Sequence, residues 1–136
     1  MKTYNEISVG DSATNSRTLT NQDILDFAKA SGDMNPAHLD AEYAATTIFK
    51  KPIAHGMWGA SLISAVLGNQ LPGPGAIYVN QTLSFKQPVY VGDTITVVVT
   101  VVSKSDERKI AQLDTVATNQ NGRIVIKGVA TAMLLS

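Results

Sequence analysis

The chain has 136 residues, of which 44% are hydrophobic and 16% charged, and its eleven basic side chains balance eleven acidic ones. This length and composition fit one globular domain over residues 1–136, and a net charge of zero supplies no long-range field that would attract nucleic acid or an anionic membrane. No cysteine occurs, which excludes disulfides, thiolate catalysis and the usual structural zinc sites.

The start of the chain shows no basic segment followed by an apolar run, so it does not resemble a secretory signal. The longest apolar stretch, residues 53–71, contains His55, Asn69, Gln70 and several glycines, which suits a buried helix better than a membrane span. We therefore expect a cytoplasmic protein that binds neither nucleic acid nor membrane.

The first predicted elements are an edge strand over residues 4–9 and a helix over residues 21–30. Thr20 stands three positions before Asp23, the spacing of a capping box, and the apolar residues that follow share one helical face. Gly32 is expected to end this helix, because glycine readily takes the left-handed conformation found at helix ends.

A loop is expected next. Asn35 precedes Pro36, and the residue before a proline is disfavoured in the α conformation. Asp33 therefore lies in a turn or loop. Asp40 can cap a second, shorter helix over residues 41–47 by accepting hydrogen bonds from its first backbone N–H groups.

The long apolar segment predicts a helix from Pro52 to about Gln70, which the proline- and glycine-rich residues 71–75 end. The second half of the chain alternates apolar and polar residues, as strands do. Four strands are expected there, over residues 77–86, 94–103, 108–118 and 123–134. Asn121 and Gly122 suit the turn between the last two. This order predicts an α+β fold in which a twisted antiparallel sheet wraps around the long helix.

Asp33 and His38 are the first candidate catalytic residues. Five positions on a continuous helix would turn them about 140° apart, so the break at Asn35 and Pro36 is what allows them to converge. A carboxylate and a neutral imidazole can together orient and activate one water molecule. The alternative is that Asp33 caps a turn and His38 packs on the surface.

Gly56 strengthens the catalytic hypothesis. At the start of the long helix its N–H can stabilise negative charge that develops on a carbonyl oxygen, although the glycine can also serve only close packing. Ser64 lies within about 80° of Gly56 around the helix, so one flank can carry both; its hydroxyl can instead bond the carbonyl four residues earlier. His55 is interpreted as orienting the loop through a backbone hydrogen bond rather than as a catalytic group.

Other chemistries find less support in the sequence. Two histidines without cysteine permit zinc only together with carboxylates, and no His-x-x-x-His spacing occurs. No glycine-rich phosphate loop precedes a helix, and no Gly-x-Ser-x-Gly elbow of a serine hydrolase is found.

Two segments, residues 33–40 and residues 49–57, resemble the characteristic motif of the MaoC-like (R)-specific enoyl-CoA hydratases. The likeness continues through residues 68–73 and 83–93 and covers nearly the whole chain. It is strongest to the small bacterial single-domain hydratases that feed polyhydroxyalkanoate (PHA) synthesis.

The resemblance implies a hot dog fold and syn hydration of a trans-2-enoyl-CoA to an (R)-3-hydroxyacyl-CoA, without metal or redox cofactor. By motif, Asp33 and His38 would hold and activate the water, with Asp33 as the base, and Gly56 N–H would bind the thioester oxygen. Ser64 matches a family serine near the catalytic residues, and Asn35 would help to shape the loop. The family also implies a homodimer whose sheets join edge to edge, with coenzyme A entering near the interface.

Two other functions remain open from the sequence. A hot dog thioesterase would hydrolyse an acyl-CoA and release free thiol. A non-catalytic acyl-CoA-binding or scaffold subunit would bind its ligand without turnover.

Overall fold

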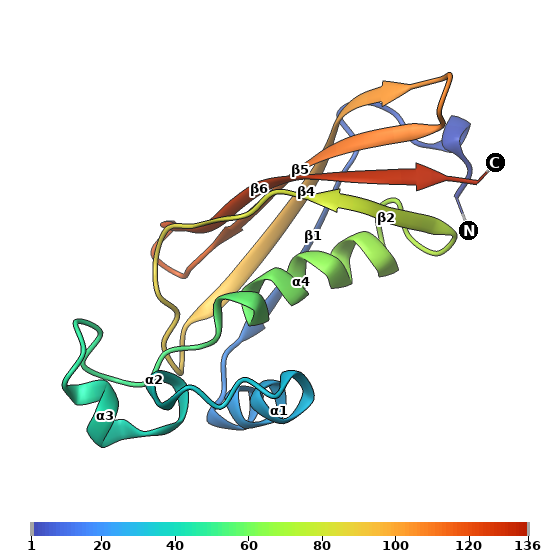
Figure 1. Cartoon of the computed structure of the whole chain (residues 1–136). Coiled ribbons are helices and arrows are strands. Elements are labelled where there is room, and N and C mark those ends of the chain that lie inside the picture. The colour runs from blue at the N-terminus through green and yellow to red at the C-terminus, as the bar shows by residue number, and fades with distance from the viewer. Residues whose placement is uncertain (1, 136) are drawn as a thin grey trace.

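An antiparallel sheet carries one long helix across its face in the computed structural model, which describes residues 2–135 (Figure 1). The helical elements are η1 (Tyr4–Glu6, a 3₁₀ turn), α1 (Asn21–Ser31), α2 (Pro36–Leu39), α3 (Ala41–Ala45) and α4 (Gly56–Asn69). The strands are β1 (Ser12–Thr18), β2 (Ala76–Gln81), β3 (Ser84–Phe85), β4 (Thr94–Ser105), β5 (Ile110–Thr118) and β6 (Ile124–Leu134). None of the helices within residues 2–135 has the length and apolar character needed to cross a membrane.

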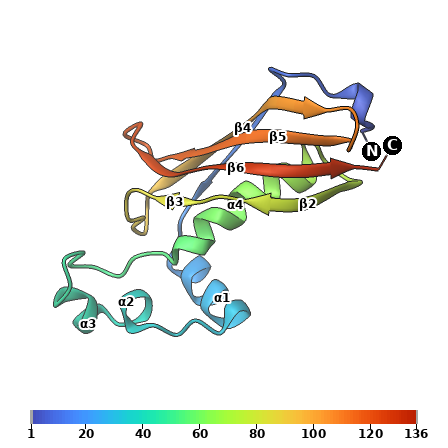
Figure 2. The same ribbon diagram turned by 45° about the horizontal axis from the view of Figure 1, so that its top comes forward.

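The sheet has the strand order β1-β4-β5-β6-β2, and β3 also pairs with β6. Every pair is antiparallel, so β4, β5 and β6 form the meander that the sequence predicts. Gly122 takes a positive φ of 77° in the β5–β6 turn, as expected for that position. The short helices α1, α2 and α3 lie together beyond the N-terminal end of α4 (Figures 1 and 2).

The core lies between the sheet and α4. The predicted inward face of β4 is confirmed, because Ile95, Val97, Val99 and Val101 are all at most 1% exposed. α4 contacts β4, β1 and β5, and its Ile63 and other apolar side chains join the same cluster. Removing these surfaces from water is the main force that holds the helix on the sheet.

The strand predicted over residues 77–86 divides into β2 and β3, and Ile77 and Val79 of β2 are 46% and 50% exposed. The regular strand pairing with β6 is interrupted at Thr82. Its backbone N–H donates to Val129 O, and its hydroxyl oxygen accepts from Val129 N. Thr82 approaches β6 so closely there that only Gly128, which has no side chain, fits opposite it.

The predicted strand over residues 4–9 is also wrong. Tyr4 begins the 3₁₀ turn η1 instead, and its ring is only 2% exposed. The Tyr4 hydroxyl donates to Asp106 Oδ1 over 2.5 Å, and Lys104 Nζ lies 4.0 Å from the ring centroid. Burial, together with the hydrogen bond to Asp106, raises the pKa of Tyr4 to about 12. Anchoring the ring this way bends the segment out of the sheet, and β1 forms the edge strand.

Three predicted helices are confirmed with small changes in their bounds. Gly32 ends α1 with a φ of 80°, and Asp40 caps α3 by accepting from Glu42 and Tyr43. α4 begins at Gly56 rather than at Pro52, because the preceding residues are extended: Ile53 forms a bridge with Tyr90, and Ala54 N–H donates to Val89 O.

A salt bridge ties β1 to the start of α1. Arg17 Nη2 lies 2.6 Å from Asp23 Oδ1, and the other oxygen of Asp23 accepts from Thr20 N in the predicted capping box. The hydrogen bond from Arg17 is the main cause that holds the pKa of Asp23 below its ordinary value. Stabilisation from this carboxylate is therefore complete above about pH 4 and is lost as the pH falls through the lowered pKa.

We expect Asp23→Asn to lower the free energy of unfolding by about 1 kcal/mol at neutral pH, since Arg17 is largely exposed and the bond is partly screened. Urea denaturation at about pH 7 and about pH 2 measures the free energy of unfolding of both proteins, and the difference between them should become smaller at the lower pH. Asp26→Asn on the exposed side of the same helix is the matched control and should change little. An undiminished difference in unfolding free energy at about pH 2 would show that the charged Asp23 carboxylate is not the cause.

Candidate active site

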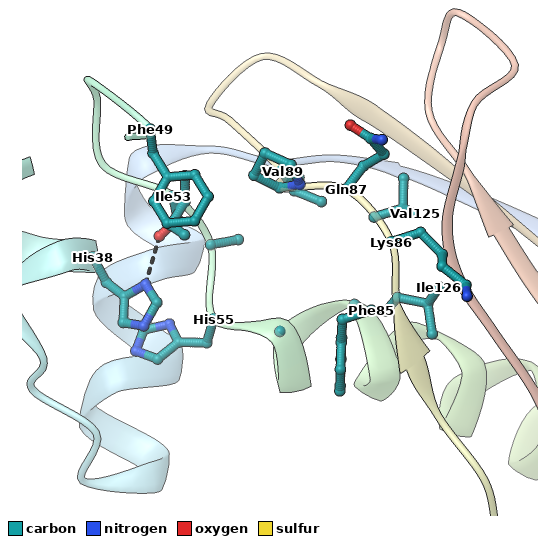
Figure 3. A pocket seen from close by; sticks show the side chains of 14 residues that line it. His38, Phe49, Ile53, His55, Phe85, Lys86, Gln87, Val89, Val125 and Ile126 are labelled. Carbon is teal, nitrogen blue, oxygen red and sulfur yellow. Dashed lines mark hydrogen bonds between the residues drawn. The ribbon is translucent and has the colours of Figure 1, made fainter. Parts of the chain in front are cut away.

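A cavity of about 280 Å³ opens beside the first turn of α4. Its walls are mostly apolar and come from the segment before α4, from β3 and the residues after it, and from the start of β6 (Figure 3). Phe49 lines it from the loop before α4, and Val125 and Ile126 line it from β6. His38 and His55 lie at one end of the cavity, and Lys86 and Gln87 lie at the other (Figure 3).

Asp33 and His38 come together across the break between α1 and α2. Gly32 ends α1 in the left-handed conformation, and Asp33 follows in an exposed loop. Asn35 then caps α2 by accepting from Ala37 N over 2.9 Å, and Asp33 Oδ1 accepts from Asn35 N over 3.1 Å. His38 stands on this one-turn helix. Ligand atoms of Asp33, His38 and His55 all lie within 4.8 Å of one another.

One ring nitrogen of His38 is held by the backbone. Its Nδ1 lies 2.7 Å from the carbonyl oxygen of Ile53, and Ile53 N–H donates in turn to Ala37 O. A carbonyl oxygen only accepts, so Nδ1 carries a proton. In the neutral ring Nε2 therefore has the free lone pair, and it is the atom that can accept a proton from a water molecule.

His55 connects the two candidate catalytic residues. It is 4% exposed and its ring stacks on His38 with 3.9 Å between centroids (Figure 3). His55 Nε2 lies 2.9 Å from the carbonyl oxygen of Asp33 and must donate to it. Within residues 2–135, His55 Nδ1 has no hydrogen-bond partner. The ring thus holds the peptide of Asp33 and the plane of His38 together.

Gly56 is the first residue of α4, where backbone N–H groups have no acceptor one turn earlier. The positive end of the helix dipole lies at the same place. A Cβ on Gly56 would come within 3.0 Å of the ring of Phe85, so the residue needs to be glycine for this ring to cover it. The result is an accessible N–H beside an apolar wall.

Ser64 is not brought to this cavity. It is exposed two turns further along α4 and does not line the chamber formed by residues 2–135. Met57 is 55% exposed, whereas Trp58 of the same helix is buried. Met57, Ser61 and Ser64 form an exposed stripe along α4, the outer stripe.

The three ligand atoms of Asp33, His38 and His55 could contact one ion, but their geometry suits water better. The two imidazole rings are stacked with 27° between their planes, so lone pairs in those planes run nearly parallel and do not converge. Zinc requires converging ligands at roughly 2 Å. A carboxylate and one imidazole nitrogen can instead orient a single water molecule.

Sequence reasoning missed the far wall of the cavity. Phe85, Gln87, Val125 and Ile126 all line it, opposite His38 (Figure 3). Phe85 is half exposed at 53%, which is unusual for an aromatic residue in an alternating strand. The alternation of apolar and polar residues does not predict this wall, because the neighbouring elements determine which face of the strand is covered.

Comparison with known proteins identifies the family of this chain. Residues 5–121 match the MaoC like domain family. The chain is 51% identical over 131 residues to an (R)-specific enoyl-CoA hydratase from Rhodospirillum rubrum, an alignment that covers 96% of this chain and 90% of that protein.

Two solved structures give the same result. The R-hydratase PhaJ1 from Pseudomonas aeruginosa, unliganded, has a TM-score of 0.91 and 45% identity, covering 97% of this chain and 84% of that one. The (R)-hydratase from Aeromonas caviae involved in PHA biosynthesis has a TM-score of 0.91 and 45% identity, covering 94% and 97%. The fold is thus the hot dog fold that the sequence resemblance implied. The chain therefore belongs to the MaoC-like family, in its group of (R)-specific enoyl-CoA hydratases.

Proposed function

We propose that this protein catalyses the reversible syn addition of water to a trans-2-enoyl-CoA, giving an (R)-3-hydroxyacyl-CoA. The observation that carries the proposal is the convergence of Asp33, His38 and His55 at an apolar cavity, which His38, His55 and Gly56 line and Asp33 does not. The apolar walls suit the acyl chain of such a substrate, and the polar residues suit its enoyl thioester, where the reaction takes place.

Asp33 and His38 act on one water molecule. The Asp33 carboxylate takes one proton from the water, while Nε2 of neutral His38 accepts a hydrogen bond from the O–H that is retained and aims the oxygen at C3 of the enoyl group. As the C3–O bond forms, the π electrons of the double bond move towards the thioester oxygen. The pair then returns a proton to C2, which completes the addition on one face and restores both groups.

The N–H of Gly56 stabilises the charge that develops on the thioester oxygen. It stands at the start of α4, where the helix dipole favours negative charge. One donor of this kind typically contributes about 10²–10³-fold to the rate. Asn35 and His55 keep the Asp33 loop and His38 in place through the contacts already described.

We also propose a homodimer. β2 is an edge strand with Ile77 and Val79 about half exposed, and an unpaired apolar edge is a surface that a second copy can complete. The outer stripe of α4 would face the partner, which would bring Ser64 into a substrate channel that the two copies share. Light scattering should give about twice the 14.4 kDa mass of one chain, and a monomer at working concentration would contradict the proposal.

The experiment that tests the activity mixes purified protein with crotonyl-CoA and follows absorbance of the conjugated thioester together with free thiol. A hydratase removes the absorbance and leaves the thioester bond intact. Release of free thiol would favour the thioesterase instead. Binding of crotonyl-CoA without either change would favour a non-catalytic subunit.

A further inference from the structure

A second, polar hollow of about 520 Å³ adjoins the catalytic cavity. Gln87 and Pro88 line both, so the two spaces share a wall. In Figure 3, Lys86 and Gln87 lie at the end of the cavity away from His38. The other walls of the hollow come from the segment before β4 and from the β5–β6 turn, and include Tyr90, Asp93, Asn119, Gln120, Asn121 and Arg123.

Hydrogen bonds between the two segments build this hollow. Gln120 Nε2 donates to Asp93 Oδ1 over 2.8 Å, and Gln120 Oε1 accepts from Thr94 N over 3.0 Å. Asn119 Oδ1 accepts from the backbone N–H groups of Asn121 and Arg123. The backbone of the turn is therefore fixed, and the guanidinium of Arg123 makes no ion pair with any residue between 2 and 135.

Positive charge gathers at the junction of the two spaces. Lys86 lines the catalytic cavity, and Lys51 Nζ lies 4.9 Å from the ring centroid of Tyr90, which lines the hollow. Asp93 is the acidic residue of the hollow, and its second oxygen accepts from Tyr90 N over 2.9 Å. Arg123 and Asp93 are the charged residues that line the hollow, and both carboxylate oxygens of Asp93 are already hydrogen bonded.

We propose that this hollow binds the phosphate-bearing nucleotide end of coenzyme A, with Arg123 as the main phosphate contact. The inference rests on the proposed acyl-CoA function and names a binding site for the rest of that substrate. The thioester must lie at Asp33 and Gly56, so the remainder of this long ligand has to leave the cavity along one of its walls. The wall shared through Gln87 leads to amide donors and a guanidinium, which binds phosphate oxygens through two parallel N–H groups.

The test compares two substrates that differ only in the nucleotide end, crotonyl-CoA and crotonyl-pantetheine. We expect Arg123→Ala to lower the ratio of kcat/KM for crotonyl-CoA over crotonyl-pantetheine by about tenfold, through a higher KM for the CoA thioester. Arg108→Ala is the matched control, because Arg108 lies in the β4–β5 turn at the other end of β5. It should keep the wild-type ratio.

An unchanged ratio in Arg123→Ala would overturn the inference, as would an equal fall in Arg108→Ala. Calorimetric titration with adenosine 3′,5′-bisphosphate separates this outcome from failure of the proposed function. One outcome is that neither substrate is hydrated, while Arg123→Ala binds this nucleotide about tenfold more weakly than wild type. The nucleotide site is then supported and the proposed activity is contradicted. If hydration proceeds, and wild type and Arg123→Ala bind the nucleotide equally, the proposed activity is supported and the nucleotide site is contradicted.

Discussion

The kcat for hydration of crotonyl-CoA is expected to fall by about 10²–10⁴-fold in Asp33→Asn and in His38→Gln. Asparagine cannot take a proton at neutral pH, and glutamine cannot present a basic nitrogen where Nε2 of His38 lies. Both changes preserve approximate size, and Asp33 is exposed, so the fold should tolerate them. The rate of absorbance loss gives kcat, and circular dichroism checks the fold.

The two residues are expected to act as a unit, because they hold the same water molecule. The double variant should therefore lose little more than the worse of the single variants. Asp40→Asn is the control for the first change: Asp40 is seven residues from Asp33, caps α3, and asparagine caps a helix equally well. Wild-type kcat in Asp33→Asn, or an equal loss in Asp40→Asn, would refute the catalytic assignment.

Gly128→Ala is expected to destabilise the protein by about 3 kcal/mol or more. A Cβ at this position of β6 would lie 1.8 Å from the backbone oxygen of Thr82. Backbone atoms cannot move aside as a side chain can, so the segment between β2 and β3 would have to leave β6. Its hydrogen bonds with Val129 would be lost at the same time. Urea denaturation measures the change in unfolding free energy.

Gly59→Ala is the matched control for this prediction. Its Cβ would lie 2.6 Å from Cδ1 of Ile126, which is the far end of a side chain that can rotate. Alanine also favours the helix over glycine by roughly 0.5–1 kcal/mol, which offsets part of the crowding. We expect a net change within about 1 kcal/mol. Equal destabilisation by Gly59→Ala and Gly128→Ala would show that crowding against the backbone is not the cause.

Periodicity predicted the parts of the fold that bury one face. The inward residues of β4 alternate and are buried, and the apolar segment after Pro52 is a helix, because each pattern reports one covered surface. Periodicity failed where contacts with residues distant in the sequence determine the backbone conformation. Tyr4 is taken out of the sheet by its contacts with Asp106 and Lys104, and the sequence near Tyr4 carries no sign of them.

The approach of Asp33 to His38 could be predicted from the sequence, because local chain geometry brings it about. The proline after Asn35 lets Asp33 and His38 meet, and a glycine at a helix start exposes its N–H. The stacking of His55 on His38 was not predicted, since it depends on how α4 and α2 pack together. The polar hollow around Arg123 joins segments about thirty residues apart, and composition gives no indication of it.

The stereochemistry of the product formed in D₂O tests the central claim most directly. In the proposed mechanism Asp33 and His38 act from one side of the substrate, so hydroxyl and deuterium should add to one face of crotonyl-CoA. The expected product is (R)-3-hydroxybutyryl-CoA with a single deuterium at C2, syn to the hydroxyl. The (S) product, or anti addition, would contradict the account.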